Sequence, residues 1–231
     1  MSIVLSSQGH FKAAAVMILV AALFDTFDGL IARLLKTMSQ FGVELDSLAD
    51  VVSFGAAPAF LIYSVHLHQY GWLGVLISSL PLAFGAFRLA RFNIQLEDIE
   101  IKQDFSGLPI PTSAITISSI VIGFYNGETI SEPISYIIIP TILLLSYLMV
   151  SKVRYSALPK LKDRALWEKF LFLLFLIFAL LFLIFTDGRA LFYFLITFVF
   201  FGIIRKLYFM ISGDKDEEDD DDIFDADEEM N

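Results

Sequence analysis

Residues 11–35 read FKAAAVMILVAALFDTFDGLIARLL, a run in which apolar side chains dominate. An α-helix needs about 20 predominantly apolar residues to cross the hydrocarbon core of a bilayer, because each residue adds only about 1.5 Å of length. The run is too long and too continuously apolar for the alternating strands of a membrane β-barrel. It therefore predicts a transmembrane helix, in which Asp25 and Asp28 require an explanation.

Six further apolar segments complete the predicted fold. The seven predicted spans are residues 11–35, 45–66, 72–92, 109–125, 133–150, 167–186 and 190–207. Together they predict an all-α, polytopic transmembrane helical bundle over residues 1–211. The first five residues, MSIVL, are typical of the end of a hydrophobic helix, so we expect an eighth span ahead of residue 1; the alternative is a short extracytoplasmic N-terminus.

The net charge separates into two parts. The formal charge is −10, and residues 214–231 alone carry −11, from twelve acids and Lys215, which leaves +1 on the rest of the chain. A mean hydropathy of +0.71 with 57 % hydrophobic residues excludes a soluble acidic domain and a disordered acidic chain. We expect residues 212–231 to form an acidic, disordered cytoplasmic tail. The sequence has no Cys, which excludes disulfides and thiolate metal sites.

Lys and Arg gather on one side of the predicted bundle. If the loop after the first span is cytoplasmic, fourteen of the sixteen basic residues lie inside, and only Lys12 and Arg189 lie outside. This positive-inside pattern predicts an integral protein of the cell (inner, cytoplasmic) membrane. The basic loop 151–169 either contacts anionic lipid headgroups or only sets the topology. His66 and His68 fall outside, far from the acids described next.

Four acids lie in or beside the first two spans, where an unpaired carboxylate costs several kcal/mol. Asp25 and Asp28 are three residues apart, and Asp46 and Asp50 are four apart, so each pair shares one face of its helix. The short turn between the helices makes them antiparallel neighbours whose carboxylates meet near the cytoplasmic surface. Oxygen ligands of this kind suit Mg²⁺ or Mn²⁺, and four carboxylates can hold two ions. The alternative is a proton or cation relay.

Small residues accompany these acids. Gly29 follows Asp28, Ala32 lies one turn further on, and Gly42 lies one turn before Asp46. Small side chains let a bulky ligand approach the backbone, although they are also common where membrane helices pack together.

Residues 25–50 follow the pattern D-x-x-D-G-x-x-A-R-x8-G-x-x-x-D-x-x-x-D. This string resembles, without a gap, the signature of the CDP-alcohol phosphatidyltransferases. The resemblance implies a membrane enzyme that displaces CMP from a CDP-linked lipid with an alcohol nucleophile and two metal ions. The implied metal ligands are Asp25, Asp28, Asp46 and Asp50, and Asp50 is also the implied general base. The residues implied to shape the nucleotide site are Gly29, Ala32, Arg33 and Gly42. The family also has a helix ahead of the signature helix, which supports the expected eighth span.

Three further segments resemble the phosphatidylserine synthase branch of this family. They are Ser53-Phe-Gly55-Ala-Ala-Pro58, Phe87-Arg88-Leu-Ala-Arg91-Phe-Asn93 and Phe105-Ser-Gly107-Leu-Pro109-Ile-Pro111. The resemblance implies CDP-diacylglycerol and L-serine as substrates, with Arg88, Arg91 and Asn93 at or near the acceptor site. Guanidinium groups bind phosphates and carboxylates, although the two arginines also suit positive-inside anchoring. An acceptor such as glycerol 3-phosphate or inositol phosphate stays open, as does an archaeal type of lipid tail.

Two other classes of protein use acids on membrane helices. A cation or proton transporter is expected to show broken helices and often inverted repeats, and neither is evident in the sequence. An aromatic prenyltransferase carries two similar acidic motifs far apart, whereas one short turn separates the two acidic pairs here. We expect the last two spans to be scaffold or dimer surface, and the protein to be a homodimer among membrane lipids without a nucleic-acid partner.

Overall fold

The computed structural model describes residues 1–35, 40–97, 107–151, 153, 155, 186 and 188–212. Within these ranges the chain is helical, and its β pairing is limited to an isolated bridge between Tyr125 and Ile130. The predicted all-α class is therefore confirmed. The predicted span at 167–186, apart from its last residue, and the acidic tail from residue 213 onward lie outside the described residues.

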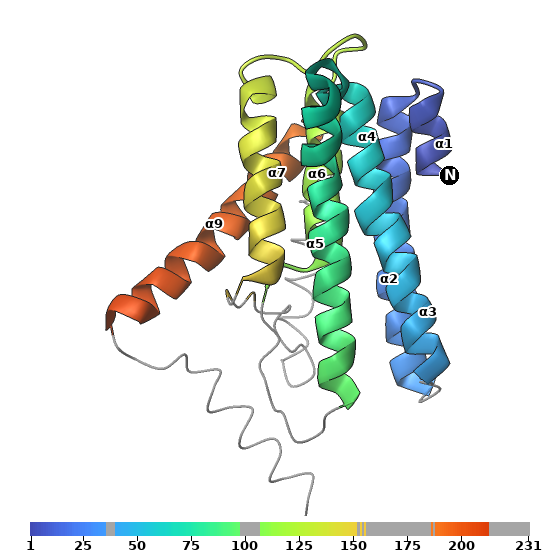
Figure 1. The fold of residues 1–231 in the computed structure, drawn as a ribbon, viewed down its shortest axis with the longest axis vertical. Helices are drawn as coiled ribbons and strands as arrows, with labels where there is room; N and C mark the ends of the chain where they lie inside the picture. Colours follow the sequence, from blue (N-terminus) through green and yellow to red (C-terminus); the bar gives the residue numbers. More distant parts are fainter. Residues whose placement is uncertain are drawn as a thin grey trace, which may run out of the picture.

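The described helices follow the predicted spans closely (Figure 1). In chain order they are α1 (Ser2–Ser7), α2 (Phe11–Leu35), α3 (Gln40–Asp50), the π-helix η1 (Val51–Ala56), α4 (Ala57–Val65), the 3₁₀-helix η2 (Leu67–Tyr70), α5 (Gly71–Glu97), α6 (Ile110–Phe124), α7 (Ile134–Val150) and α9 (Arg189–Ser212). The span predicted at residues 45–66 is thus one helical rod made of α3, η1 and α4. Helix α5 is longer than its predicted span at both ends, and reaches Glu97.

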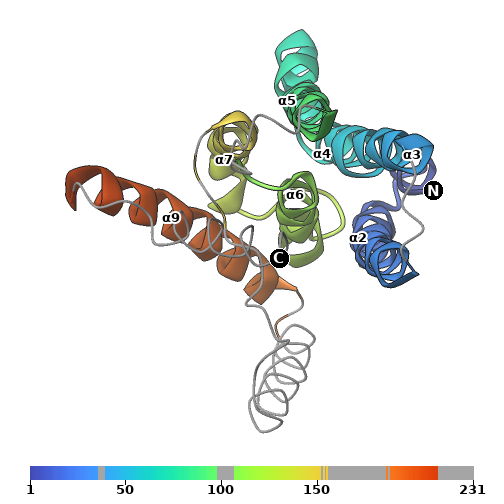
Figure 2. The ribbon, with the colours of Figure 1, turned by 90° about the horizontal axis from the view of Figure 1, so that it is seen from below.

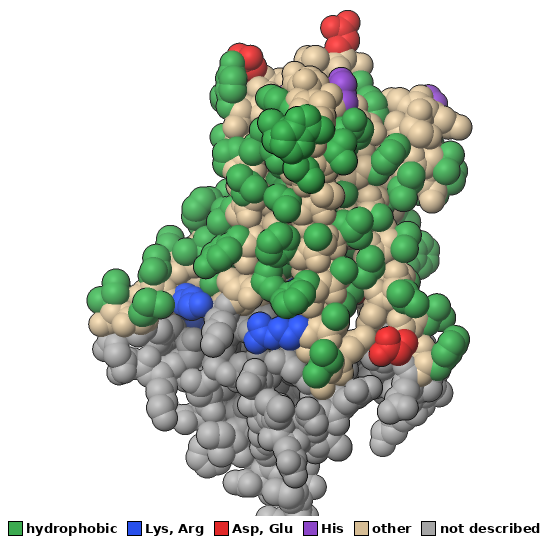
Figure 3. Space-filling model, viewed as in Figure 1, with side chains coloured by type: hydrophobic (Ala, Val, Ile, Leu, Met, Phe, Trp, Pro, Cys, Tyr) green, Lys and Arg blue, Asp and Glu red, His purple; other side chains and the backbone are tan. Residues whose placement is uncertain are grey.

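The lengths of these helices support a membrane protein without establishing the predicted count of seven spans. By length and composition, Glu44–Val65, Leu67–Ile94 and Arg189–Tyr208 can cross a bilayer, while Ile110–Phe124 and Ile134–Val150 are shorter apolar helices. Many large apolar side chains are exposed on the bundle surface, as hydrocarbon around a membrane protein permits (Figure 3).

Helix α6 forms the centre of the bundle. It contacts α2, α4, α7 and α9, which surround it when the molecule is viewed from below (Figure 2). Its apolar side chains are fully buried at Ile110, Ala114, Ile117 and Ile120. Each surrounding helix packs an apolar stripe against α6, so the burial of these side chains holds the helices in their positions around it.

The structure explains why a glycine stands at position 107, in one of the three segments that resemble the phosphatidylserine synthase branch. Its φ of +99° lies in the region that favours glycine, and a Cβ there would lie 2.4 Å from the Met149 carbonyl oxygen. Its N–H donates to the Val153 carbonyl at 2.8 Å, and the N–H of Leu108 donates to the Leu148 carbonyl at 3.0 Å. The turn that leads into α6 is therefore held by backbone hydrogen bonds to the end of α7 and to the residues that follow it.

The two ends of the bundle differ in their polar residues. The end of α2, the start of α3 and the end of α5 all lie at the lower end of the molecule in Figure 1. On the face shown in Figure 3, Lys and Arg of the described chain lie at this lower end, whereas His lies at the upper end. The acids of α2 and α3 therefore lie toward the more basic end.

Candidate active site

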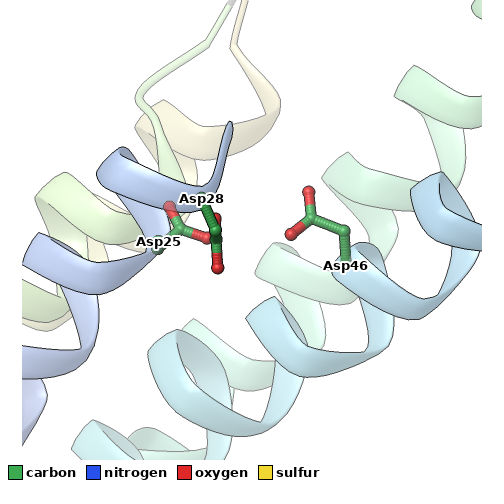
Figure 4. Close-up of side chains that lie close together, drawn as sticks. All are labelled: Asp25, Asp28 and Asp46. Atoms are coloured by element: carbon green, nitrogen blue, oxygen red, sulfur yellow. The ribbon is translucent and has the colours of Figure 1, made fainter. Parts of the chain in front are cut away.

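Three of the four acids form a compact cluster between α2 and α3. One carboxylate oxygen from each of Asp25, Asp28 and Asp46 lies within 4.8 Å of the other two. Figure 4 shows Asp25 and Asp28 on one helix, facing Asp46 across the gap between the helices. The i, i+3 spacing brings the first two together, and the antiparallel arrangement of α2 and α3 brings the third opposite them.

Asp50 completes the cluster from the last turn of α3. Its carboxyl group lies within hydrogen-bonding distance of Asp25, and electrostatic interactions link it to Asp46 and to Arg88 of α5. Asp25 and Asp50 are partly buried, whereas Asp28 and Asp46 are exposed. The structure therefore brings together the four acids that the sequence singled out, with two of them open to a ligand.

A π-helix begins directly after Asp50, and the sequence contained no signal for it. Each turn of η1, Val51–Ala56, takes in an extra residue, a geometry that is rare and frequently occurs at functional sites. It buries Phe54 and Gly55, and a Cβ on Gly55 would lie 3.0 Å from Leu82 Cδ1 and 3.3 Å from Leu82 Cα. Gly55 thus allows η1, which directly follows Asp50, to approach the backbone of α5 closely.

The residues expected to shape the nucleotide site lie on both sides of the cluster. A Cβ added to Gly29 would meet nothing within 4 Å, so the space beside Asp28 is open. Gly42 lies on the exposed first turn of α3. Ala32 and Arg33 lie on the last turns of α2, and their side chains are outside the described part of the structure.

The three residues expected at the acceptor site lie on the last turns of α5. Arg88 interacts electrostatically with Asp50, and its Nε is buried with no hydrogen-bond partner among the described residues. Arg91 is half-buried one turn further on. Asn93 does not face open space, because its side chain forms hydrogen bonds with Ser47 and Glu44 of α3. Sequence reasoning missed both α3 partners.

An apolar recess lies beside the acidic cluster. It has a volume of about 240 Å³ and lies between α1, α2, η1 and α4. Its wall includes Phe24, which precedes Asp25, and Val52 and Ser53, which follow Asp50. An apolar space therefore lies next to a strongly anionic one, an arrangement that suits a ligand with a charged head and an apolar tail.

Comparison with known proteins decides the family. The profile of the CDP-alcohol phosphatidyltransferases matches residues 1–150 of this chain. The chain belongs to the CDP-alcohol phosphatidyltransferase family. Curated relatives of this family member include the CDP-diacylglycerol–serine O-phosphatidyltransferase of Helicobacter pylori, 38 % identical over 217 residues, which are 91 % of this chain and 86 % of the relative.

Two other relatives differ in the lipid that their names describe. The archaetidylserine synthase of Methanothermobacter thermautotrophicus is 40 % identical over 160 residues, which are 67 % of this chain and 63 % of the relative. The CDP-diacylglycerol–serine O-phosphatidyltransferase of Bacillus subtilis is 37 % identical over 152 residues, which are 65 % of this chain and 78 % of the relative. All three names contain serine.

The residues of this phosphatidyltransferase fit divalent cations. Enzymes of the family generally use divalent metals, and carboxylate oxygens are the ligands that Mg²⁺ and Mn²⁺ prefer. Four converging carboxylates repel one another, and Arg88 interacts electrostatically with Asp50 alone among them. The donor set and its excess negative charge therefore both favour binding of positive ions.

Proposed function

We propose that this protein transfers a phosphatidyl group from CDP-diacylglycerol to the hydroxyl of L-serine, which gives phosphatidylserine and CMP. The observation that carries the proposal is the convergence of Asp25, Asp28 and Asp46 within 4.8 Å, with Asp50 against Asp25, in a member of this family. The relatives named as serine transferases support serine as the acceptor.

The four acids have two roles in this proposal. Asp25, Asp28, Asp46 and Asp50 hold two divalent cations, Mg²⁺ or Mn²⁺. When bound, such ions neutralise a diphosphate and stabilise the charge that develops on the departing CMP oxygen. Asp50 also acts as general base and accepts the proton of the serine hydroxyl, because a neutral hydroxyl is a weak nucleophile. The serine oxygen then forms its bond to phosphorus as the bond from phosphorus to the CMP oxygen breaks.

The residues around the acids orient the two substrates. Gly29 and Gly42, with Ala32 and Arg33, shape the nucleotide site, and the open space beside Gly29 supports this role. Arg88 and Arg91 bind the acceptor carboxylate or a phosphate, since a guanidinium group pairs well with either. Asn93 lies at the same end of α5, where it contacts Ser47 and Glu44 of α3. The apolar recess beside Phe24 and Val52 suits an acyl chain of the donor.

The proposal includes a location and an assembly. The acids lie toward the more basic end of the bundle, which supports an active site that faces the cytoplasm of the cell membrane. Nucleotide and serine then reach the site from water while the acyl chains stay in the bilayer. The exposed apolar face of α9, which includes Phe194, Phe201 and Ile204, suits the surface of a homodimer or contact with lipid.

The deciding experiment measures CMP release by the purified protein in detergent with CDP-diacylglycerol and Mn²⁺ or Mg²⁺. Serine, glycerol 3-phosphate and inositol phosphate are compared as acceptors, and a CDP-archaeol donor is compared with CDP-diacylglycerol. We expect metal-dependent release with serine, and a loss of at least about 100-fold in Asp50→Asn because the base is removed. Metal-independent release, or full activity in Asp50→Asn, would falsify the mechanism, and preference for another acceptor would reassign the substrate.

A further inference from the structure

Helix α3 carries two of the four acids but has little apolar packing. None of its side chains that the structure describes is buried, and Phe41, Leu45 and Leu48 are 77 %, 55 % and 65 % exposed. Asp46 faces the carboxylates of α2, and like charges at this distance repel one another. A helix with few buried side chains and a repulsive neighbour requires another restraint to keep its acids in place.

Asn93 of α5 forms a polar contact with α3 at this point. The Ser47 hydroxyl donates to Asn93 Oδ1 at 3.3 Å, and Asn93 Nδ2 donates to Ser47 Oγ at 3.1 Å. Nδ2 also lies 3.4 Å from Glu44 Oε1. Ser47 directly follows Asp46 and lies three residues before Asp50, so the contact acts on the turn of α3 that carries both acids.

A carboxamide is suited to this position. It offers one acceptor and two donors, so it can exchange hydrogen bonds with a hydroxyl and donate to a carboxylate at the same time. An acid in place of Asn93 would repel Glu44, and a lysine or arginine there would have no acceptor for the Ser47 hydroxyl. The residue type therefore matches its two partners on α3.

We propose that Asn93 and Ser47 are positioning residues, which hold α3 against α5 and so keep Asp46 and Asp50 opposite Asp25 and Asp28. This inference rests on the proposed cation site, but it concerns the placement of the ligands and not their identity. It also separates two roles for Asn93. A residue that binds serine affects the KM for serine, whereas a residue that positions α3 affects the binding of cations.

The test measures Mn²⁺ binding to the purified protein in detergent, from the electron paramagnetic resonance signal of free Mn²⁺. The variants are Asn93→Ala, Ser47→Val and their combination, with Ser47→Thr as the matched control because Thr and Val differ only in the hydroxyl. Ser79→Ala, on α5 nine residues before Arg88, controls for loss of a serine hydroxyl, because the Ser79 hydroxyl donates only within its own helix, to the Leu76 carbonyl. Size-exclusion elution checks that each variant is folded.

We expect Asn93→Ala and Ser47→Val each to raise the Mn²⁺ concentration for half-saturation by about 3- to 10-fold, as loss of a hydrogen-bonded contact predicts. The double variant should bind Mn²⁺ as tightly as the weaker-binding single variant does, because both changes remove the same contact. Ser47→Thr and Ser79→Ala should bind as the wild type does, and the KM for serine at saturating Mn²⁺ should change less than about twofold in every variant. If Asn93→Ala fails to fold, the Ser47→Val and Ser47→Thr pair still tests the contact.

Four results would overturn the inference. Unchanged Mn²⁺ binding in Asn93→Ala with a raised KM for serine would place Asn93 at the acceptor instead. Additive effects of the two changes would show that they act separately. A wild-type protein that binds no Mn²⁺ would overturn the proposed cation site and this inference together, whereas normal wild-type binding with unaffected variants would overturn this inference alone.

Discussion

We expect Asp46→Asn to be more stable than the wild type in the absence of divalent cations. When divalent cations are added, we expect it to be less stable than the wild type. Without cations, the Asp46 carboxylate lies within 4.8 Å of oxygens of both Asp25 and Asp28. Two unit charges at that separation repel by about 1 kcal/mol in water-like surroundings and by about 3 kcal/mol near a protein surface. Asp46 is exposed, so the lower value applies to each pair.

Removal of this charge should therefore stabilise the cation-free protein by about 1–2 kcal/mol, since Asn keeps the size of the side chain but not its charge. With cations the comparison reverses. A ligand at 100 times its dissociation constant stabilises a folded protein by about 2.7 kcal/mol, and Asp46→Asn loses one ligand of the site. The wild type should then gain most of this stabilisation and the variant little of it.

The assay is thermal unfolding in detergent, followed by tryptophan fluorescence in EDTA and in MnCl₂. In EDTA the variant should melt higher than the wild type, by about 2–4 °C for each kcal/mol, and in MnCl₂ it should melt lower. Glu128→Gln is the matched control, because Glu128 is exposed in the loop between α6 and α7 and belongs to no acidic cluster that the structure describes. A variant that is less stable in EDTA, or that gains as much from Mn²⁺ as the wild type, would refute the reasoning.

Two glycines give further predictions. Gly29→Leu fills the open space beside Asp28, so the protein should still fold while the KM for CDP-diacylglycerol rises at least about tenfold, measured by CMP release at varied donor concentration. Gly107→Ala places a Cβ 2.4 Å from the Met149 carbonyl oxygen at a φ of +99°, so it should destabilise the protein by about 1–3 kcal/mol in thermal unfolding. An unchanged KM for CDP-diacylglycerol in Gly29→Leu would contradict a role for the space beside Asp28 in donor binding. An unchanged melting temperature in Gly107→Ala would contradict the close approach of Gly107 to the Met149 carbonyl.

The acidic cluster was predictable from the sequence because its determinants are local. A spacing of three or four residues places two side chains on one helix face in any α-helix, and a short turn makes consecutive helices neighbours. Asp25 and Asp28 therefore had to face the same way, as did Asp46 and Asp50. Hydropathy likewise predicted the positions of α2, α5, α6 and α7, since burial in lipid requires long apolar runs.

Other features of the site depend on contacts between residues that are far apart in the chain. The contact between Ser47 and Asn93 joins positions 46 residues apart, and it exists only because α5 returns beside α3. The π-helix after Asp50 follows no pattern of residue types, and its close approach to Leu82 depends on how α5 packs. The sequence singled out Asn93 but not its partners for this reason.

The sequence by itself determined which residues are charged within apolar helices and at which spacing, and its resemblance to the family indicated the ions and the reaction that we propose. Periodicity and hydropathy act over a few residues, so they can be read without coordinates. Tertiary structure alone decided how the pairs meet, with Asp50 beside Asp25 and in electrostatic interaction with Arg88, and with Asn93 of α5 hydrogen-bonded to α3. Those contacts depend on the packing of whole helices around α6, which is a property of the bundle and not of any one segment.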